Sequence, residues 1–257
     1  MTKIILGMDI STTCTGVSLL KYDTDTEEKQ ILYIGSVKFK VPKDLTLEES
    51  LFVKSKQFTD DFIIKYKDIG ITDICIESPL TTSNNAQTCG ILNRFNGMLS
   101  QSIYEATGIA PHYISSFDAR KYAFPILTSV RRYDKNDVQY PIDKIRKSIA
   151  KNELTPFGSY TYSTDKKYIL WELIDEQFQG IVWQYNKKGD LRKENFDASD
   201  SLVASLGWIN KCKYSETEPY IIERSEEEIS DEEGNKFIKL TYTVDFCGEQ
   251  HTKNVIF

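Results

Sequence analysis

Four acidic residues constrain this chain more than any other feature, because each lies where apolar secondary structure would direct it toward the others. Asp9 and Glu77 each follow an apolar, strand-like run, at residues 4–8 and 74–76. Asp197 and Asp200 open an apolar helical stretch and share one helix face, since they are three residues apart. Carboxylates gathered in this way repel one another unless divalent cations hold them. The pattern therefore predicts metal-ion chemistry on phosphate.

Length and hydropathy indicate an ordinary folded chain. Its 257 residues allow one substantial core with an appendage, or two small domains, and 40% of them are hydrophobic. The mean hydropathy is −0.40, and no apolar run approaches the length of a membrane span. The first residues enter a strand pattern directly, without the order of segments that defines a signal peptide. We therefore expect a cytoplasmic protein with no membrane partner.

Cysteine and histidine usage narrows the chemistry. The five cysteines are dispersed and never form a Cys-x-x-Cys pair, which argues against a disulfide framework or a zinc ribbon. The two histidines, His112 and His251, leave little basis for a His-rich zinc site or a Ser-His-Asp triad. Hydrolytic chemistry would then depend on carboxylates, and so on oxygen-ligated metals such as Mg²⁺ or Mn²⁺.

The net charge of −6 is unevenly distributed along the chain. Acidic residues between positions 223 and 233 are enough to explain the negative balance. Basic residues gather instead at positions 120–121, 131–132, 144–151 and 166–167. A locally basic face that binds nucleic acid is therefore compatible with an acidic chain.

Apolar periodicity predicts an α/β chain. Runs at residues 3–11, 17–22 and 31–41 predict an antiparallel three-stranded meander, followed by a helix over 47–66. Two further strands, 72–77 and 111–114, fit a right-handed parallel crossover through a long helix over 84–107. Helices over 165–179 and 197–210 complete the predicted core.

Two stretches differ from this pattern. Residues 125–162 form a basic, Tyr-rich insertion with one expected helix at 141–151. Residues 213–257 are first acidic and then alternate in hydropathy around a turn at 233–235, which predicts a β-hairpin appendage. We therefore expect a core domain over residues 1–212 and an acidic C-terminal extension over 213–257.

The segments that carry the four acids resemble those of RuvC-like Holliday-junction resolvases. Residues 7–18 resemble the first strand and turn of that family, residues 76–79 with the long helix resemble its second acidic strand and helix, and residues 197–202 resemble its terminal Asp-x-x-Asp helix. The likeness covers residues 3–124 and 163–210. It implies a ribonuclease H-like fold, with a mixed five-stranded sheet flanked by helices.

The same resemblance implies an activity and partners. The family nicks branched DNA such as four-way junctions as a Mg²⁺-dependent homodimer. The insertion 125–162 is longer than the family pattern, and residues 213–257 have no counterpart in it. The extended form is similar to phage-encoded relatives, which would place the protein in the host cytoplasm.

The resemblance also implies roles for single residues. Asp9 would bridge two Mg²⁺ ions, for which Mn²⁺ could substitute, Glu77 would hold one ion, and Asp200 with Asp197 would complete the other. Lys166 lies in a segment that resembles the one carrying the family's basic active-site residue, and would neutralise phosphate charge. The residues expected to bind DNA are Arg120, Lys121, Arg131, Arg132, Lys166 and Lys167.

Other interpretations remain open at the level of the sequence. Residues 7–13 also resemble the first phosphate loop of actin- and sugar-kinase-type phosphotransferases, although the chain has only 13 glycines and no glycine-rich adenosine site. A generic ribonuclease H-like nuclease and a non-catalytic branched-DNA-binding module are further alternatives. Taken alone, Asp9 could cap a turn, Glu77 could be a solvent-facing strand end, and Asp197 could be a helix N-cap.

Overall fold

The computed structural model describes residues 1–79, 86–124, 166–214, 220–230, 234, 236–246 and 249–256. Its contacts divide the chain into two compact units. Unit 1 comprises Met1–Ala119 and Gly180–Ile209, and unit 2 comprises Arg120–Gln179 and Asn210–Phe257. The helix predicted at 141–151 lies outside the described residues.

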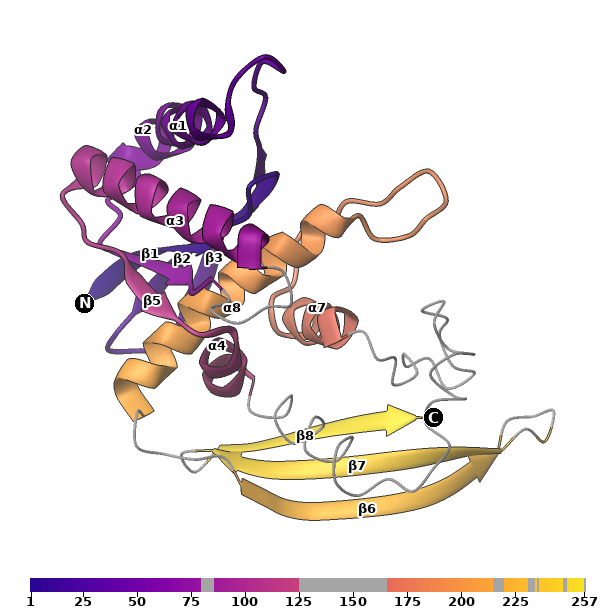
Figure 1. The fold of residues 1–257 in the computed structure, drawn as a ribbon. Coiled ribbons are helices and arrows are strands. Elements are labelled where there is room, and N and C mark those ends of the chain that lie inside the picture. Colours follow the sequence, from indigo (N-terminus) through magenta and orange to yellow (C-terminus); the bar gives the residue numbers. More distant parts are fainter. Residues whose placement is uncertain are drawn as a thin grey trace. The chain divides into compact units, whose positions relative to one another are not determined.

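Unit 1 is built on a five-stranded mixed sheet (Figure 1). The strands are β1 (Thr2–Asp9), β2 (Cys14–Asp23), β3 (Lys29–Lys38), β4 (Asp73–Glu77) and β5 (His112–Ile114). Their spatial order is β3-β2-β1-β4-β5, in which β3, β2 and β1 are antiparallel and β1, β4 and β5 are parallel. The predicted meander followed by parallel strands is confirmed.

One face of this sheet carries the hydrophobic core. Alternate residues of β1, β2 and β4 meet the apolar sides of α1 (Leu47–Phe58) and α3 (Ala86–Thr107) there. The fully buried side chains of this layer include Leu6, Met8, Val17, Leu19, Leu51, Phe58, Ile74, Ile76, Phe95, Leu99 and Ile103. Residues of the other parity, such as Gly7 and Cys75, therefore point to the opposite face of the sheet.

The opposite face of the sheet packs against α8 (Lys193–Tyr214), which crosses on the side away from α1 and α3 (Figure 1). The Cys75 thiol donates to the carbonyl of Ala204 at 3.3 Å. A Cβ at Gly7 would overlap the carbonyl of Ser201, so only glycine permits this approach. The helix begins four residues before its predicted start, at Lys193 rather than Asp197. Asp197 is therefore interior to the helix, and its interpretation as an N-cap is wrong.

The helix predicted over 47–66 is interrupted in the structure. α1 begins with a capping box, in which the Thr46 hydroxyl accepts from the Glu49 backbone N–H and the Glu49 carboxylate accepts from the Thr46 backbone N–H. A π-helical turn (Thr59–Ile63), α2 (Ile64–Tyr66) and a 3-10 turn (Lys67–Ile69) follow. The wider π-helical turn lets Phe58, Phe62 and Ile63 all reach the core.

Helix α3 has apolar residues on more than one side, and α1 covers part of this surface. The Ser55 hydroxyl of α1 donates to the Met98 carbonyl at 3.2 Å and lies 2.8 Å from the Ser102 hydroxyl. Phe95, Leu99 and Ile103 are buried in the core. Two neighbours within the same chain thus occupy most of the apolar stripe of α3.

Helix α4 (Ser116–Ala123) was missed in the sequence. The hydroxyl of Ser115 accepts from the backbone N–H of Asp118 at 3.0 Å, which satisfies a donor of the first turn. The short helix contains both polar and apolar residues without a clear stripe. Helical periodicity alone therefore could not identify it.

Unit 2 contains α7 (Lys166–Gln177) and a three-stranded antiparallel sheet, ordered β6-β7-β8. Its strands are β6 (Tyr220–Ser230), β7 (Lys236–Phe246) and β8 (Glu249–Ile256). The predicted hairpin is present as β6 and β7, with Gly234 at φ +82° in its turn, and β8 extends it by one strand. Among the described helices, none is both long and apolar enough to cross a membrane.

The approach of α8 to the sheet can be tested with a pair of glycine variants. Gly7→Ala should destabilise the protein by about 1–3 kcal/mol, because the added methyl would overlap the Ser201 carbonyl and the Ser205 hydroxyl. Gly97→Ala in α3 adds a methyl in open space and should stabilise by roughly 0.5–1 kcal/mol. Urea unfolding followed by circular dichroism measures both. A Gly7→Ala variant as stable as the wild type would contradict the close packing.

Candidate functional site

Asp9 and Glu77 end two neighbouring parallel strands. β1 and β4 pair in parallel with Met8 opposite Ile76, so the next residue of each strand, Asp9 and Glu77, lies at the same level. The carboxyl ends of parallel strands are the edge of a sheet at which binding residues usually collect. The structure therefore places the first two predicted acids at one edge.

Both acids also belong to the face of the sheet that α8 covers. Side chains alternate along a strand, so Asp9 shares its face with Gly7, and Glu77 shares its face with Cys75. Gly7 and Cys75 are the residues whose contacts with α8 are described above. The Oε2 atom of Glu77 is buried. A solvent-facing strand end is therefore not a sufficient description of Glu77.

Helix α8 brings the third acid to the same edge. Gly16 is the β2 residue directly opposite Asp9, and a Cβ at Gly16 would overlap the carbonyl of Asp197. The backbone of Asp197 therefore rests on the strand beside Asp9. Asp200 follows one helical turn later and is only 3% exposed. Aspartate is rarely buried to this degree unless it is paired or bound to a metal ion.

The electrostatics around Cys14 report the negative charge at this edge. Burial raises the pKa of the Cys14 thiol, and the charges of Asp197 and Glu194 raise it further. The Ser36 hydroxyl and the Lys38 ammonium partly oppose this rise. Acids of α8 are therefore close enough to the start of β2 to act on its side chains.

Two lysines connect the segments that carry or adjoin the acids. Lys38, the last residue of β3, forms an ion pair with Glu194 near the start of α8. Lys54 of α1 donates from Nζ to the carbonyl of Thr12 at 2.8 Å, and Thr12 belongs to the turn that follows Asp9. Ser11 closes this turn, because its hydroxyl donates to the Cys14 carbonyl at 2.6 Å and accepts from the Cys14 backbone N–H. The turn is thus held from both sides.

The donor set suits a hard divalent cation. Asp9, Glu77, Asp197 and Asp200 offer only carboxylate oxygens, which Mg²⁺ and Mn²⁺ prefer. Within the described residues, which include all four acids, no three or more His, Cys, Asp or Glu side chains are grouped as a ready-made metal site. Carboxylates repel one another, so the cations themselves would have to draw these side chains together. Two Mg²⁺ ions at this edge stay a prediction.

The predicted DNA-binding residues differ in how exposed they are, and two of them lie outside the described residues. Lys121 is only 6% exposed, with its Nζ 5.0 Å from the centroid of the Tyr122 ring, so it is not the surface residue that we expected. Arg120 and Lys167 are half-buried, and Lys166 is the first residue of α7. Arg131 and Arg132 lie outside the described residues. The roles of these residues in catalysis and DNA binding stay predictions.

Gly7 and Gly16 are the positions beside the candidate site to which the sequence analysis assigned no role. Both allow the close approach of α8 to the sheet. The signal that could have revealed them is the small-residue side of α8, which carries Ala198, Ser201, Ala204 and Ser205. Small residues one turn apart on a helix match glycines on a strand where the two backbones approach closely.

Comparison with known proteins finds similarity only among solved structures. No family model and no curated protein matches it. Among solved structures, it is similar to T. thermophilus RuvC in complex with a Holliday junction substrate, with 8% identity over 85% of this chain and 99% of that chain and a TM-score of 0.46. A second Thermus thermophilus RuvC structure has 10% identity over 84% of this chain and 99% of that chain, with a TM-score of 0.47.

A third solved structure is less similar to this chain. The ROK hexokinase from Thermus thermophilus has 15% identity over 48% of this chain and 38% of that chain, with a TM-score of 0.26. At such identities and TM-scores, an activity has to be inferred from this chain's own residues.

The ion pair between Lys38 and Glu194 predicts a pH dependence. Its hydrogen bond to Lys38 lowers the pKa of Glu194 from its usual 4.5. A carboxyl group with a lowered pKa in the folded chain stabilises it above the unfolded pKa, and this contribution is lost as pH falls through the folded pKa.

Lys38→Met should therefore lower the free energy of unfolding at pH 7, by less than about 1 kcal/mol because the pair is partly exposed. The difference from wild type should fade as the solution is acidified below about pH 4. Urea unfolding at both pH values measures it, and a difference that grows on acidification would contradict this assignment.

Proposed function

We propose that this chain is a metal-dependent, structure-selective DNA endonuclease that cleaves Holliday junctions or other branched DNA. The observation that carries the proposal is the meeting of Asp9, Glu77 and the Asp197–Asp200 turn at one edge of the sheet. The backbones that carry these acids come from two strands and one helix, and strand pairing together with the close packing of α8 brings them to that edge. A fold has no structural need to gather like charges in this way.

The carboxylates define the chemistry that such an edge can support. Asp9, Glu77, Asp197 and Asp200 would hold two Mg²⁺ ions, which when bound supply an activated water and stabilise the leaving oxygen of a phosphodiester. The protein's own contribution is to place the backbone of Asp197 beside Asp9 through the Gly16 contact, and to brace the turn that follows Asp9 through Lys54. The two histidines are not required for this chemistry.

The preference for branched DNA is supported by the resemblance of the acid-bearing segments to RuvC-like resolvases. A four-way junction has two-fold symmetry, and its resolution needs two nicks in strands of like polarity. A homodimer with two-fold symmetry supplies two sites related in the same way. We therefore include a homodimer in the proposal, together with DNA contacts from Lys166 and Lys167.

Cleavage of defined substrates tests the function. Labelled four-way junction, duplex, flap and RNA–DNA hybrid would be incubated with the full chain, with and without Mg²⁺. We expect Mg²⁺-dependent cleavage of the junction in preference to the duplex. Preferential cleavage of the hybrid would instead indicate a generic ribonuclease H-like enzyme, and the absence of any cleavage with Mg²⁺ or Mn²⁺ would overturn the proposal.

Single carboxylate-to-amide variants test the metal site. Asp9→Asn and Asp200→Asn should each reduce cleavage by more than about 100-fold, a loss that even residues one shell outside the ligands can cause. DNA binding should persist, since removing a carboxylate lessens repulsion of phosphate. Asp68→Asn, an exposed acid in the 3-10 turn after α2, is the matched control and should cleave normally. Wild-type turnover in either site variant would exclude the four-acid site.

The assembly can be tested by sedimentation. The full chain should sediment as a dimer at micromolar concentration. Because α1 covers part of α3, the exposed apolar side chains on these two helices include Tyr104 of α3 (54% exposed) and Phe52 of α1 (61% exposed). The double variant Phe52→Glu with Tyr104→Glu should shift the chain toward monomer, whereas Val182→Glu (91% exposed in the wild type) should not. A wild-type chain that is monomeric with and without junction DNA would rule out symmetric resolution.

A further inference from the structure

The segment between β3 and α1, residues 38–46, turns its lysines outward in a fixed conformation. Phe39 packs inward against Phe95, with ring centroids 5.5 Å apart and an interplanar angle of 89°. Its neighbours Lys38 and Lys40 are exposed, as alternation along an extended chain requires. The backbone N–H of Lys40 donates to the side-chain oxygen of Gln57 in α1 at 3.1 Å. The segment is therefore anchored at one end by a ring contact and a hydrogen bond, and at the other by the Thr46 cap of α1.

The charges of this region are partly balanced within the chain, and two are left over. Lys38 is paired with Glu194, and Lys54 donates to the Thr12 carbonyl. In the part of the chain that the structure describes, Lys40 and Lys43 form no ion pair with an acid.

The acids nearest in sequence do not cancel these two charges. Glu48 is paired with Arg94 at 2.9 Å, and Glu49 is used in the capping box of α1. Asp44 follows Lys43 directly and balances at most one of the two lysines. With the Lys54 ammonium close by, the segment keeps a net positive charge.

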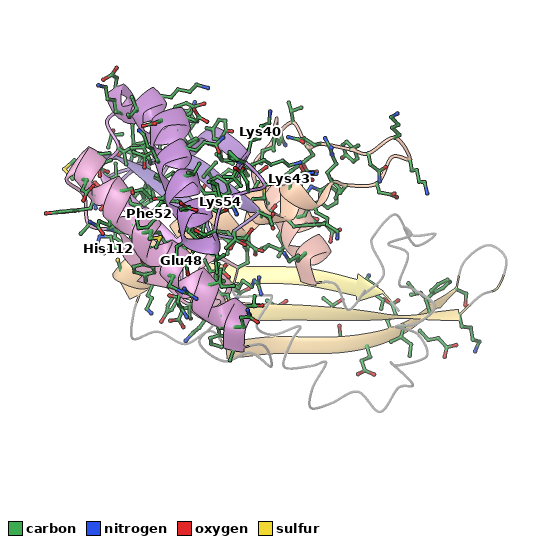
Figure 2. All side chains as sticks on the ribbon, turned by 45° about the horizontal axis from the view of Figure 1, so that its top comes forward. Lys40, Lys43, Glu48, Phe52, Lys54 and His112 are labelled. Carbon is green, nitrogen blue, oxygen red and sulfur yellow. The ribbon has the colours of Figure 1, made fainter. Side chains whose placement is uncertain are left out.

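The segment also leaves the sheet at the edge that carries the acids. Lys38 is opposite Cys14 on β2, two residues before the Gly16 that faces Asp9. Neighbouring strands are about 4.8 Å apart, so β3 lies about 10 Å from β1. Figure 2 shows Lys40, Lys43 and Lys54 on one side of unit 1 and His112, which begins β5 at the opposite end of the sheet, on the other.

We propose that Lys40 and Lys43 bind the phosphodiester backbone of DNA on the β3 side of the acids, an inference that rests on the proposed nuclease function. Nucleotides advance by about 3.4 Å per step along one strand. Because this step is the rise along the helix axis and successive phosphates are farther apart through space, a strand whose cleaved phosphate lies at the acids would pass the start of this segment, about 10 Å away, within about one to three nucleotides. An anchored segment that exposes two ammonium groups suits a passing polyanion, because both charges face solvent.

Binding measured without cleavage tests this surface. The full chain in EDTA would be titrated with labelled four-way junction at increasing salt. Two lost phosphate contacts should reduce the slope of log K against log salt by about two. If the variant Lys40→Gln with Lys43→Gln and the wild type converge at 1 M salt, the variant should bind about 60-fold more weakly at 0.1 M salt, since 10 to the power 1.8 is about 60.

Two further variants make the result specific. Lys21→Gln with Lys67→Gln removes the same charge from exposed lysines, with Lys21 opposite Ile4 at the amino end of β1 and Lys67 in the turn before β4. This control should bind like the wild type. Lys40→Arg with Lys43→Arg keeps the charge and should retain the salt slope, which separates loss of charge from damage to the segment.

The outcomes distinguish this inference from the function on which it rests. Wild-type binding that the Lys40 and Lys43 glutamine variant leaves unchanged, or that the Lys21 and Lys67 control weakens equally, would overturn the inference and leave the nuclease proposal standing. A wild-type chain that binds no DNA at low salt would overturn both. Normal binding with no cleavage in Mg²⁺ would overturn the nuclease proposal alone.

Discussion

The close contact of α8 with the β1–β2 ladder is the constraint on which the rest of the site depends. Two residues of a strand advance by about 6.8 Å, and four residues of a helix by about 6 Å. Residues one turn apart on α8 can therefore meet alternate positions along the ladder. Asp197 meets Gly16, and Ser201 meets Gly7. Because both strand positions are glycine, the helix lies low enough on the sheet to bring Asp197 to the level of Asp9.

The same packing explains why the acids are found on one face. The core side of β1 and β4 is filled by Leu6, Met8, Ile74 and Ile76, so the alternate residues must face α8. At the ends of both strands these alternate residues are carboxylates. Asp200, one helical turn after Asp197, is itself buried, so little water screens its charge. An edge of this kind is costly for the fold on its own, and the divalent cations that we propose would offset that cost if they bound there.

The sequence predicts those parts of the structure whose signal is local and repeated. Apolar runs with periods of 2 and 3.6 residues predict the five strands and the long helices. The four acids are recognisable because they interrupt or end these runs. The true start of α8, the π-helical turn after Phe58 and the burial of Lys121 depend on contacts between distant segments. Such contacts override local preference. The role of Gly7 was hidden for the same reason, since a glycine in a strand becomes informative only when the helix above it is known.

The charged residues show most clearly that contacts between distant segments override what the local sequence suggests. Clusters of basic residues in the sequence indicated Arg120 and Lys121 as DNA-binding residues. In the structure, however, Lys121 is buried beside the Tyr122 ring. The two acidic residues of α1 already have partners: Glu48 forms an ion pair with Arg94, and Glu49 takes part in the capping box with Thr46. A polyanion interacts with the exposed charge that is left after ion pairs and caps within the chain have been formed. A net charge of −6 therefore does not oppose nucleic-acid binding at an edge where two exposed lysines of a short anchored segment form no ion pair with the described acids.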